Sequence, residues 1–166
     1  SSTVVGLAAA FGSGAMTNSV AEIEDADCIF VIGSNTTSSH PLVATRIFRA
    51  KEKGAKLVVA DPRKIQLALK ADTYVRHRLG TDVALLNGIM HVILKNNWHD
   101  QKFIEERCEG FEEFSRVIEN YPPEKVSEIT GVSADDIVKI AEYYAKADAA
   151  TIIYCMGITQ HTTGVD

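Results

Sequence analysis

The chain has 166 residues, of which 46% are hydrophobic and 23% charged, a composition typical of a folded globular protein rather than a disordered one. Its 22 acidic and 17 basic residues give a formal net charge of −5, which disfavours a surface that coats nucleic acid. No apolar run approaches the roughly 20 residues of a membrane span, and the length suits one compact domain over residues 1–166.

Four short apolar runs are predicted to be strands, and they cover residues 28–33, 56–61, 73–79 and 150–156. The first, second and fourth are almost continuously apolar, as expected for strands that are covered on both faces of a parallel sheet. The third alternates between apolar and polar residues, which suits an edge position or the lining of a site.

Helices are predicted between these strands from their start signals. Ser19–Glu22 has capping-box spacing and leads into a short helix, and Pro41–Lys53 has a proline and a following glycine placed to begin and end a helix. We expect Asp82 to cap a largely apolar, deeply buried helix over Asp82–Asn96, and Asp100 and Ser133 to cap two more.

This alternation predicts an α/β fold, a doubly wound and mainly parallel sheet with helices on both faces in a Rossmann-like, three-layer αβα arrangement. In such sheets ligands bind beyond the carboxyl ends of the strands. The loops that follow the predicted strands are therefore the candidate site.

The loop after residues 28–33 reads GSNTTSSHP and presents six consecutive small hydroxyl or amide side chains before a helix begins. It lacks the G-x-G-x-x-G pattern, which disfavours a nicotinamide dehydrogenase. Such a loop can bind a phosphate or pyrophosphate through hydroxyls, backbone N–H groups and the helix dipole, and the alternative is a polar turn that caps the next helix. Its candidate ligand-binding residues are Gly33, Ser34, Asn35, Thr36, Ser38, Ser39 and His40.

The segment Asp61-Pro62-Arg63 follows the second predicted strand. A carboxylate at this position commonly accepts hydrogen bonds from ribose hydroxyls, and an arginine can pair with a phosphate or stack on a base. The alternative is a helix-capping aspartate beside a surface arginine.

Two further loops complete the candidate site. Gly80, Thr81 and Asp82 follow the third predicted strand, and Asp82 has two possible roles: an N-cap, or a carboxylate that accepts the adjacent N–H donors of guanine. After the fourth strand, Gly157 allows close approach of the backbone to a ligand, and Gln160 offers neutral donors and acceptors beside Met156.

Catalytic and metal-binding signals are missing from the sequence. No His–carboxylate–nucleophile arrangement and no metal-ligand spacing can be read, so no catalytic residue and no metal ligand is assigned. The sequence has three cysteines and no C-x-x-C motif, so the cysteines cannot form a zinc ribbon or an iron–sulfur cluster by themselves. They are Cys28, Cys108 and Cys155. Their odd, low number favours a reducing compartment, so we expect a cytoplasmic protein.

The sequence resembles the molybdopterin oxidoreductase family, and within it the alpha subunits of the molybdenum- or tungsten-dependent formate dehydrogenases. The resemblance covers essentially the whole chain and is carried by ordered segments: GSGAMTNSVAEIEDAD, VIGSNTTSSHP, VVADPRK, GTDVALLNGIMHVI, EGFEEF, ITGVSADDI and MGITQHTTGVD.

The resemblance implies a bis(molybdopterin guanine dinucleotide) cofactor that carries molybdenum or tungsten. It assigns the Gly33–Pro41 loop to a pyrophosphate, Asp61–Arg63 to a guanosine ribose and base, Gly80–Asp82 to guanine, and Met156–Gln160 to the pterin. The family's metal ligand, a cysteine or selenocysteine followed by histidine, falls ahead of a stretch like Ser1–Leu7, so none of the three cysteines matches it.

From this resemblance we expect the central cofactor-binding domain of a formate dehydrogenase, which oxidises formate to carbon dioxide and passes two electrons to an iron–sulfur cluster outside this chain. Expected partners are the remaining domains of the same polypeptide and iron–sulfur electron-transfer subunits, with no nucleic acid and no membrane span. We expect the 166 residues alone to bind no cofactor and to be inactive. The alternatives are the same domain of another branch, such as a nitrate reductase, and a noncatalytic nucleotide-binding domain.

Overall fold

The computed structural model describes residues 2–165, which form two compact units. The sheet unit comprises the described residues 2–76 and 147–165, and the helical unit comprises residues 77–146. The sheet and its flanking loops thus come from both ends of the chain, and the intervening segment 77–146 forms the second compact unit.

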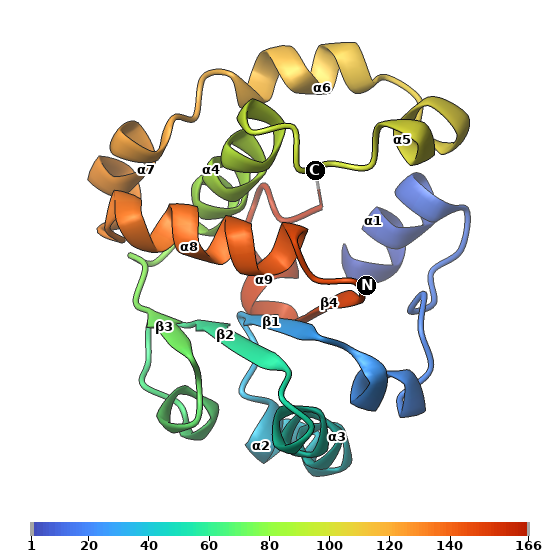
Figure 1. Ribbon diagram of the computed structural model, residues 1–166, viewed down its shortest axis with the longest axis vertical. Coiled ribbons are helices and arrows are strands. Elements are labelled where there is room, and N and C mark those ends of the chain that lie inside the picture. Colours follow the sequence, from blue (N-terminus) through green and yellow to red (C-terminus); the bar gives the residue numbers. More distant parts are fainter. Residues whose placement is uncertain (1, 166) are drawn as a thin grey trace. The chain divides into compact units, whose positions relative to one another are not determined.

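The sheet unit contains a four-stranded parallel sheet in the order β3-β2-β1-β4 (Figure 1). Its strands are β1 (Cys28–Ile32), β2 (Lys56–Ala60), β3 (Thr73–Val75) and β4 (Ala150–Tyr154). The predicted α/β class with a parallel sheet is confirmed. Every residue of β1, and every residue of β2 after its first, is buried, as expected for strands rich in β-branched residues inside a parallel sheet.

The third strand is shorter than predicted, because it ends at Val75 rather than Leu79. Val75 pairs with Ala60, the last residue of β2, so the ladder has no further partner. Beyond it the backbone N–H of Arg78 donates to the carbonyl oxygen of Thr130 at 2.8 Å, inside the helical unit.

The fourth strand differs from the prediction of a strand covered on both faces. β4 pairs with β1 alone and lies at the outer edge of the sheet. Its residues alternate between exposed and half-buried, with Ile152 exposed by 41% and Tyr154 by 37%. The apolar run at residues 150–156 therefore predicted the position of β4 correctly but its burial incorrectly. The burial of a strand depends on which elements lie beside it, and an apolar run does not specify them.

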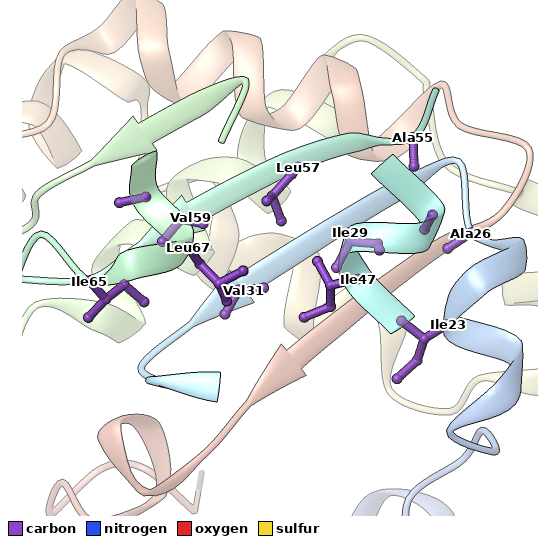
Figure 2. Close-up of a cluster of buried hydrophobic side chains, with 12 residues drawn as sticks. Ile23, Ala26, Ile29, Val31, Ile47, Ala55, Leu57, Val59, Ile65 and Leu67 are labelled. Atoms are coloured by element: carbon purple, nitrogen blue, oxygen red, sulfur yellow. The ribbon is translucent and has the colours of Figure 1, made fainter. Parts of the chain in front are cut away.

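One face of the sheet is covered by α3 (Pro41–Glu52), which begins at the predicted proline. Its buried residues Ala44, Ile47 and Ala50 recur every three positions and form one apolar stripe. Ile47 and Ala50 of this stripe belong to a core shared with β1, β2 and the 3-10 helices η1 (Ala21–Asp25) and η2 (Gln66–Leu69), and Figure 2 shows the side chains of that core.

The predicted capping box is confirmed at the start of η1. The Ser19 N–H donates to the Glu22 carboxylate at 2.5 Å, and the Glu22 N–H donates to the Ser19 hydroxyl at 3.4 Å. The sheet unit also contains α1 (Ser2–Phe11), which the sequence analysis did not predict, and the short helices α2 (Thr36–Ser39) and α9 (Met156–Thr159). None of the residues of α1 is buried.

The helical unit consists of α4 (Asp82–Lys95), α5 (Gln101–Arg107), α6 (Phe111–Ile118), α7 (Pro123–Thr130) and α8 (Ala134–Ala145). Two of the three caps predicted for this unit are confirmed: Asp100 accepts from the Phe103 N–H at 2.9 Å, and Ser133 accepts from the Asp136 N–H at 3.1 Å. Within residues 2–165 no helix is long and apolar enough to cross a membrane.

The helix α4 is less buried than its apolar sequence predicts. Leu85, Gly88, Ile89 and Val92 form its buried face, whereas Val83 is 38% exposed. A Cβ added at Gly88 would lie 2.9 Å from the Val126 side chain, so this glycine allows α7 to approach α4 closely.

Candidate functional site

The order β3-β2-β1-β4 places a topological switch point between β1 and β4. From β1 the chain proceeds through β2 to β3 on one side, and it later returns to add β4 on the other side of β1. In open α/β sheets ligands bind in the crevice beyond the strand ends at such a point. The loops that follow β1 and β4 are therefore the candidate ligand-binding loops of the sheet unit.

These two loops touch each other through glycine backbones. The Gly157 N–H donates to the carbonyl oxygen of Gly33 at 3.1 Å, and Gly33 has a φ of +59°. A Cβ at Gly157 would lie 2.4 Å from that oxygen, and a Cβ at Gly33 would lie 2.8 Å from the carbonyl carbon of Gly157. The sequence analysis predicted that Gly157 lets the backbone approach a ligand, and the segment that it approaches in this structure is Gly33.

The polar loop after β1 divides into an inner and an outer set of side chains. Ser34 and Thr36 are buried, and their hydroxyl groups hydrogen-bond to each other at 2.8 Å. Asn35 is half-buried, while Ser38, Ser39 and His40 are exposed at the end of α2 and the start of α3. The outer set offers hydroxyl, amide and imidazole groups to a ligand, and the inner pair holds the loop.

The outer set is itself ordered by local hydrogen bonds. The Ser39 hydroxyl donates to the carbonyl oxygen of Asn35 at 3.0 Å, and Nδ1 of His40 lies 3.0 Å from the Ser39 hydroxyl oxygen. The backbone N–H of Ser38 also donates to Asn35 at 3.0 Å. These bonds form a compact turn that leads into α3, as the short side chains of the GSNTTSSHP sequence favour.

The segment after β2 contains a buried carboxylate and an exposed guanidinium. Asp61 is only 3% exposed, and its Oδ1 accepts from the Arg63 N–H at 2.8 Å, which closes a tight turn around Pro62. The Arg63 side chain is 74% exposed, with Nε 3.7 Å from the same oxygen. Arg63 is thus the more accessible group of this segment, and Asp61 is partly committed to its own loop.

Tyr74 on β3 supports this segment and was not singled out by the sequence analysis. Its hydroxyl donates to the carbonyl oxygen of Asp61 at 3.1 Å. Burial, opposed by the charge of Arg76 and reinforced by that of Asp61, raises the pKa of the Tyr74 hydroxyl, which therefore stays protonated as a donor. The alternating pattern of the third strand was the signal that could have indicated it.

The loop after β4 presents two exposed candidates and one buried residue. Met156 is 64% exposed and Gln160 is exposed, at the two ends of α9. Thr159 is buried, and its hydroxyl oxygen accepts from the Thr3 hydroxyl at 3.0 Å, which connects α9 to α1.

The candidate residues of the helical unit lie in the turn before α4. Gly80 adopts a φ of +77°, and the Thr81 hydroxyl donates to the carbonyl oxygen of Arg78 at 2.7 Å. The prediction that Asp82 is the N-cap is wrong, because Thr81 occupies the cap position and Asp82 is the first helical residue. The Asp82 carboxylate instead lies 2.8 Å from Nε2 of His77, with both side chains almost completely buried.

No other chemistry-bearing cluster stands out among the described residues. Within residues 2–165, no three His, Cys, Asp or Glu side chains are arranged to hold a metal ion. Burial, with a further contribution from the charge of Asp72, raises the pKa of Cys28 to about 11, so this thiol stays protonated at neutral pH. Two hollows of about 330 and 410 Å³ lie beside α4 in the helical unit, and neither is lined by a predicted site residue.

The most similar curated relatives include several formate dehydrogenases. The chain is 56% identical to the F420-dependent formate dehydrogenase 1 subunit alpha of Methanococcus maripaludis, over 100% of this chain and 25% of that protein. It is 46% identical to formate dehydrogenase H of Escherichia coli, over 99% of this chain and 23% of that protein. The chain thus spans about a quarter of the length of the curated relatives it matches.

Proteins that are not named formate dehydrogenases are also similar to this chain. A nitrate reductase of Symbiobacterium thermophilum is 40% identical over 98% of this chain and 23% of its own length. Among solved structures, acetylene hydratase from Pelobacter acetylenicus superposes with a TM-score of 0.86 at 32% identity, over 99% of this chain and 22% of that one. The model of one family, described as molybdopterin oxidoreductase, matches residues 5–166. The chain therefore belongs to the molybdopterin oxidoreductase family.

Proposed function

We propose that this chain is the central cofactor-binding part of a molybdenum- or tungsten-dependent formate dehydrogenase, and that it binds a guanine dinucleotide form of the cofactor. Membership of the family implies a molybdopterin cofactor. The formate assignment is supported by relatives named formate dehydrogenases at 56% and 46% identity, against 40% for the nitrate reductase.

The switch point between β1 and β4 is the observation that carries the proposal. Two backbones meet there at Gly33 and Gly157, and this contact brings the polar loops after β1 and β4 together at the strand ends where ligands of such sheets bind. Exposed hydroxyl, amide and guanidinium donors flank this point, and such donors suit the negative charge of a pyrophosphate. The residues of the sheet unit therefore fit the nucleotide end of such a cofactor.

Each segment has a defined task in this proposal. Ser38 and Arg63 donate hydrogen bonds to phosphate oxygens, and the Asp61 loop orients a ribose. Asp82 accepts hydrogen bonds from a guanine base. The bound cofactor supplies the two-electron redox chemistry, and the residues of this chain hold and orient it.

The substrate is tested in a longer polypeptide that contains residues 1–166. We expect formate to reduce a viologen dye, and nitrate not to oxidise the reduced dye at a comparable rate. The opposite result would assign the protein to the nitrate reductase branch. The 166-residue chain alone is expected to reduce no dye with formate, and measurable formate-dependent reduction by it would contradict the proposal.

Cofactor binding has its own test in the same longer polypeptide. Arg63→Ala is expected to lower the pterin and metal content of the purified protein, because it removes an exposed guanidinium from the binding loop. Lys64→Ala is the matched control, because it removes the next exposed cation along the chain. Equal cofactor content in both variants would remove Arg63 from the site.

A further inference from the structure

The turn that precedes α4 is fixed at both ends by basic side chains. Arg78 donates its backbone N–H to Thr130 at 2.8 Å, and its guanidinium donates to the carbonyl oxygens of Glu128 and Ile129 at the end of α7. Its neighbour His77 contacts the Asp82 carboxylate, five residues along the chain. Arg78 thus anchors the turn to the end of α7, and His77 anchors it to Asp82, the first residue of α4.

The contact between His77 and Asp82 is short and shielded from water. Nε2 of His77 lies 2.8 Å from Oδ1 of Asp82, and the two side chains are 0% and 6% exposed. A hydrogen bond in such surroundings has a strong orienting effect, because the low local dielectric strengthens it relative to a bond in water. The direction of the Asp82 carboxylate therefore depends on His77.

The other ring nitrogen indicates which tautomer is present. Nδ1 of His77 is buried and has no hydrogen-bond partner. A proton on Nδ1 would be a buried donor without an acceptor, whereas a bare nitrogen at that position is tolerated more readily. The geometry accordingly favours Nε2 as the ring nitrogen that donates its proton to Asp82.

The rest of the turn leaves Asp82 little freedom to compensate. The N–H and hydroxyl of Thr81 both donate to the carbonyl oxygen of Arg78, at 3.3 and 2.7 Å. Gly80 supplies the positive φ that this closed turn requires. With the backbone fixed in this way, the 2.8 Å contact to His77 contributes directly to the direction of the carboxylate.

We propose that His77 is a positioning residue that orients the Asp82 carboxylate for recognition of a guanine base, and so sets the preference of this loop for guanine over adenine nucleotides. The inference rests on the proposed role of Asp82. Guanine presents two adjacent N–H donors, whereas adenine presents one acceptor and one donor on the corresponding edge. A misdirected Asp82 carboxylate therefore loses the discrimination between the two bases rather than general affinity for nucleotides.

The test compares GDP and ADP binding by calorimetry to the cofactor-free form of a longer polypeptide that contains residues 1–166, with thermal unfolding of every variant measured alongside. His77→Leu removes the donor, and His77→Gln keeps an amide N–H near the position of Nε2. We expect His77→Leu to lower the ratio of GDP to ADP affinity by about tenfold, the equivalent of one lost discriminating hydrogen bond. His77→Gln is expected to restore most of that ratio.

Two further variants separate positioning from folding. His91→Leu removes another histidine hydrogen bond of the helical unit, from Nδ1 to the carbonyl oxygen of Ile118 at 3.0 Å, and should leave the ratio unchanged. In an Asp82→Ala background, His77→Leu should cause no additional loss of preference, because His77 acts through Asp82. If His77→Leu does not fold, the His77→Gln and Asp82→Ala comparisons still decide the point.

The outcomes distinguish the inference from the function on which it rests. A wild-type chain with no preference for GDP over ADP would overturn the guanine-reading role of Asp82 itself. A wild-type preference that is lost in Asp82→Ala but retained in His77→Leu would leave that role in place and overturn the inference. Lower thermal stability of His77→Leu with an unchanged affinity ratio would likewise show that His77 has only a structural role.

Discussion

The candidate loops of the two units are held in different ways. In the sheet unit, the loops after β1 and β4 meet through the backbones of Gly33 and Gly157. In the helical unit, the turn before α4 is held by the side chains of His77 and Arg78. A backbone contact excludes every side chain larger than hydrogen, whereas a side-chain contact can be preserved by a replacement of similar shape and donor pattern. Substitutions should therefore have all-or-none effects in the first case and graded effects in the second.

The largest effect is expected at the glycine contact. Gly157→Ala places a Cβ 2.4 Å from the carbonyl oxygen of Gly33, so one of the two loops must move. We expect the free energy of unfolding to fall by about 2–3 kcal/mol, a typical cost of overpacking, measured by urea denaturation. Nucleotide affinity should fall together with stability, because the loops after β1 and β4 can no longer make their backbone contact.

Gly54→Ala is the control for this prediction. Gly54 has a φ of +104°, and a Cβ there would meet nothing within 4 Å, so the substitution tests backbone strain without a clash. A loss of roughly 1–2 kcal/mol is expected from the conformation alone. Nucleotide binding should be unchanged, since Gly54 lies at the other end of α3 from the loop after β1. If Gly157→Ala were as stable as the wild type, the proposed role of the contact would be wrong.

A smaller effect should separate the inner and outer hydroxyls of the loop after β1. Ser34→Ala leaves the buried Thr36 hydroxyl without its 2.8 Å partner, and we expect a loss of about 1 kcal/mol in unfolding free energy. Ser38→Ala removes an exposed hydroxyl and should change stability by less than about 0.5 kcal/mol. Equal stability losses would show that the inner pair does not hold the loop.

Local sequence signals predicted much of the fold. The strand starts, the proline that begins α3, the Ser19–Glu22 capping box and the caps at Asp100 and Ser133 were all confirmed. Each of these depends on contacts within a few residues, or on an apolar run long enough to favour a strand. Such signals can be read from the local sequence, because they do not depend on contacts with distant parts of the chain.

The remaining features depend on contacts that sequence spacing does not specify. The exposure of β4 follows from its place at the edge of the sheet, and α1 has no polar face from which a helix could be predicted. The inward direction of Ser34 and Thr36 in an aperiodic loop could not be read from residue type. The pairing of His77 with Asp82 crosses a turn made possible by Gly80, and an aspartate before a helix resembles an N-cap in sequence.

The smallest effect is expected where a side chain supports the backbone inside the sheet unit. The Asp72 carboxylate accepts from the Leu57 N–H at 2.8 Å and from Lys51 Nζ at 2.8 Å. Burial alone would raise the pKa of Asp72, but the hydrogen bonds from Leu57 and Lys51, with the charges of Lys51 and Lys56, outweigh it and lower the pKa. The stabilisation from this carboxylate is therefore present above the unfolded pKa of about 3.9 and is lost as the pH falls through the lower folded value.

Asp72→Asn should remove this contribution, which we expect to be about 1 kcal/mol at pH 7 after allowance for partial exposure. The measurement is the difference in unfolding free energy between wild type and variant, followed from pH 7 to pH 2. That difference should be constant down to about pH 5 and then shrink toward zero, because the protonated wild-type side chain resembles the amide. Asp25→Asn, at a side chain that is 78% exposed, is the matched control and should show little difference at any pH. If the difference in unfolding free energy for Asp72→Asn stayed the same down to pH 2, the contribution of Asp72 at Leu57 would come from the packing of the side chain and not from the charge of the carboxylate. The contrast between segments held by backbone contacts and segments held by side chains would then extend to this position as well.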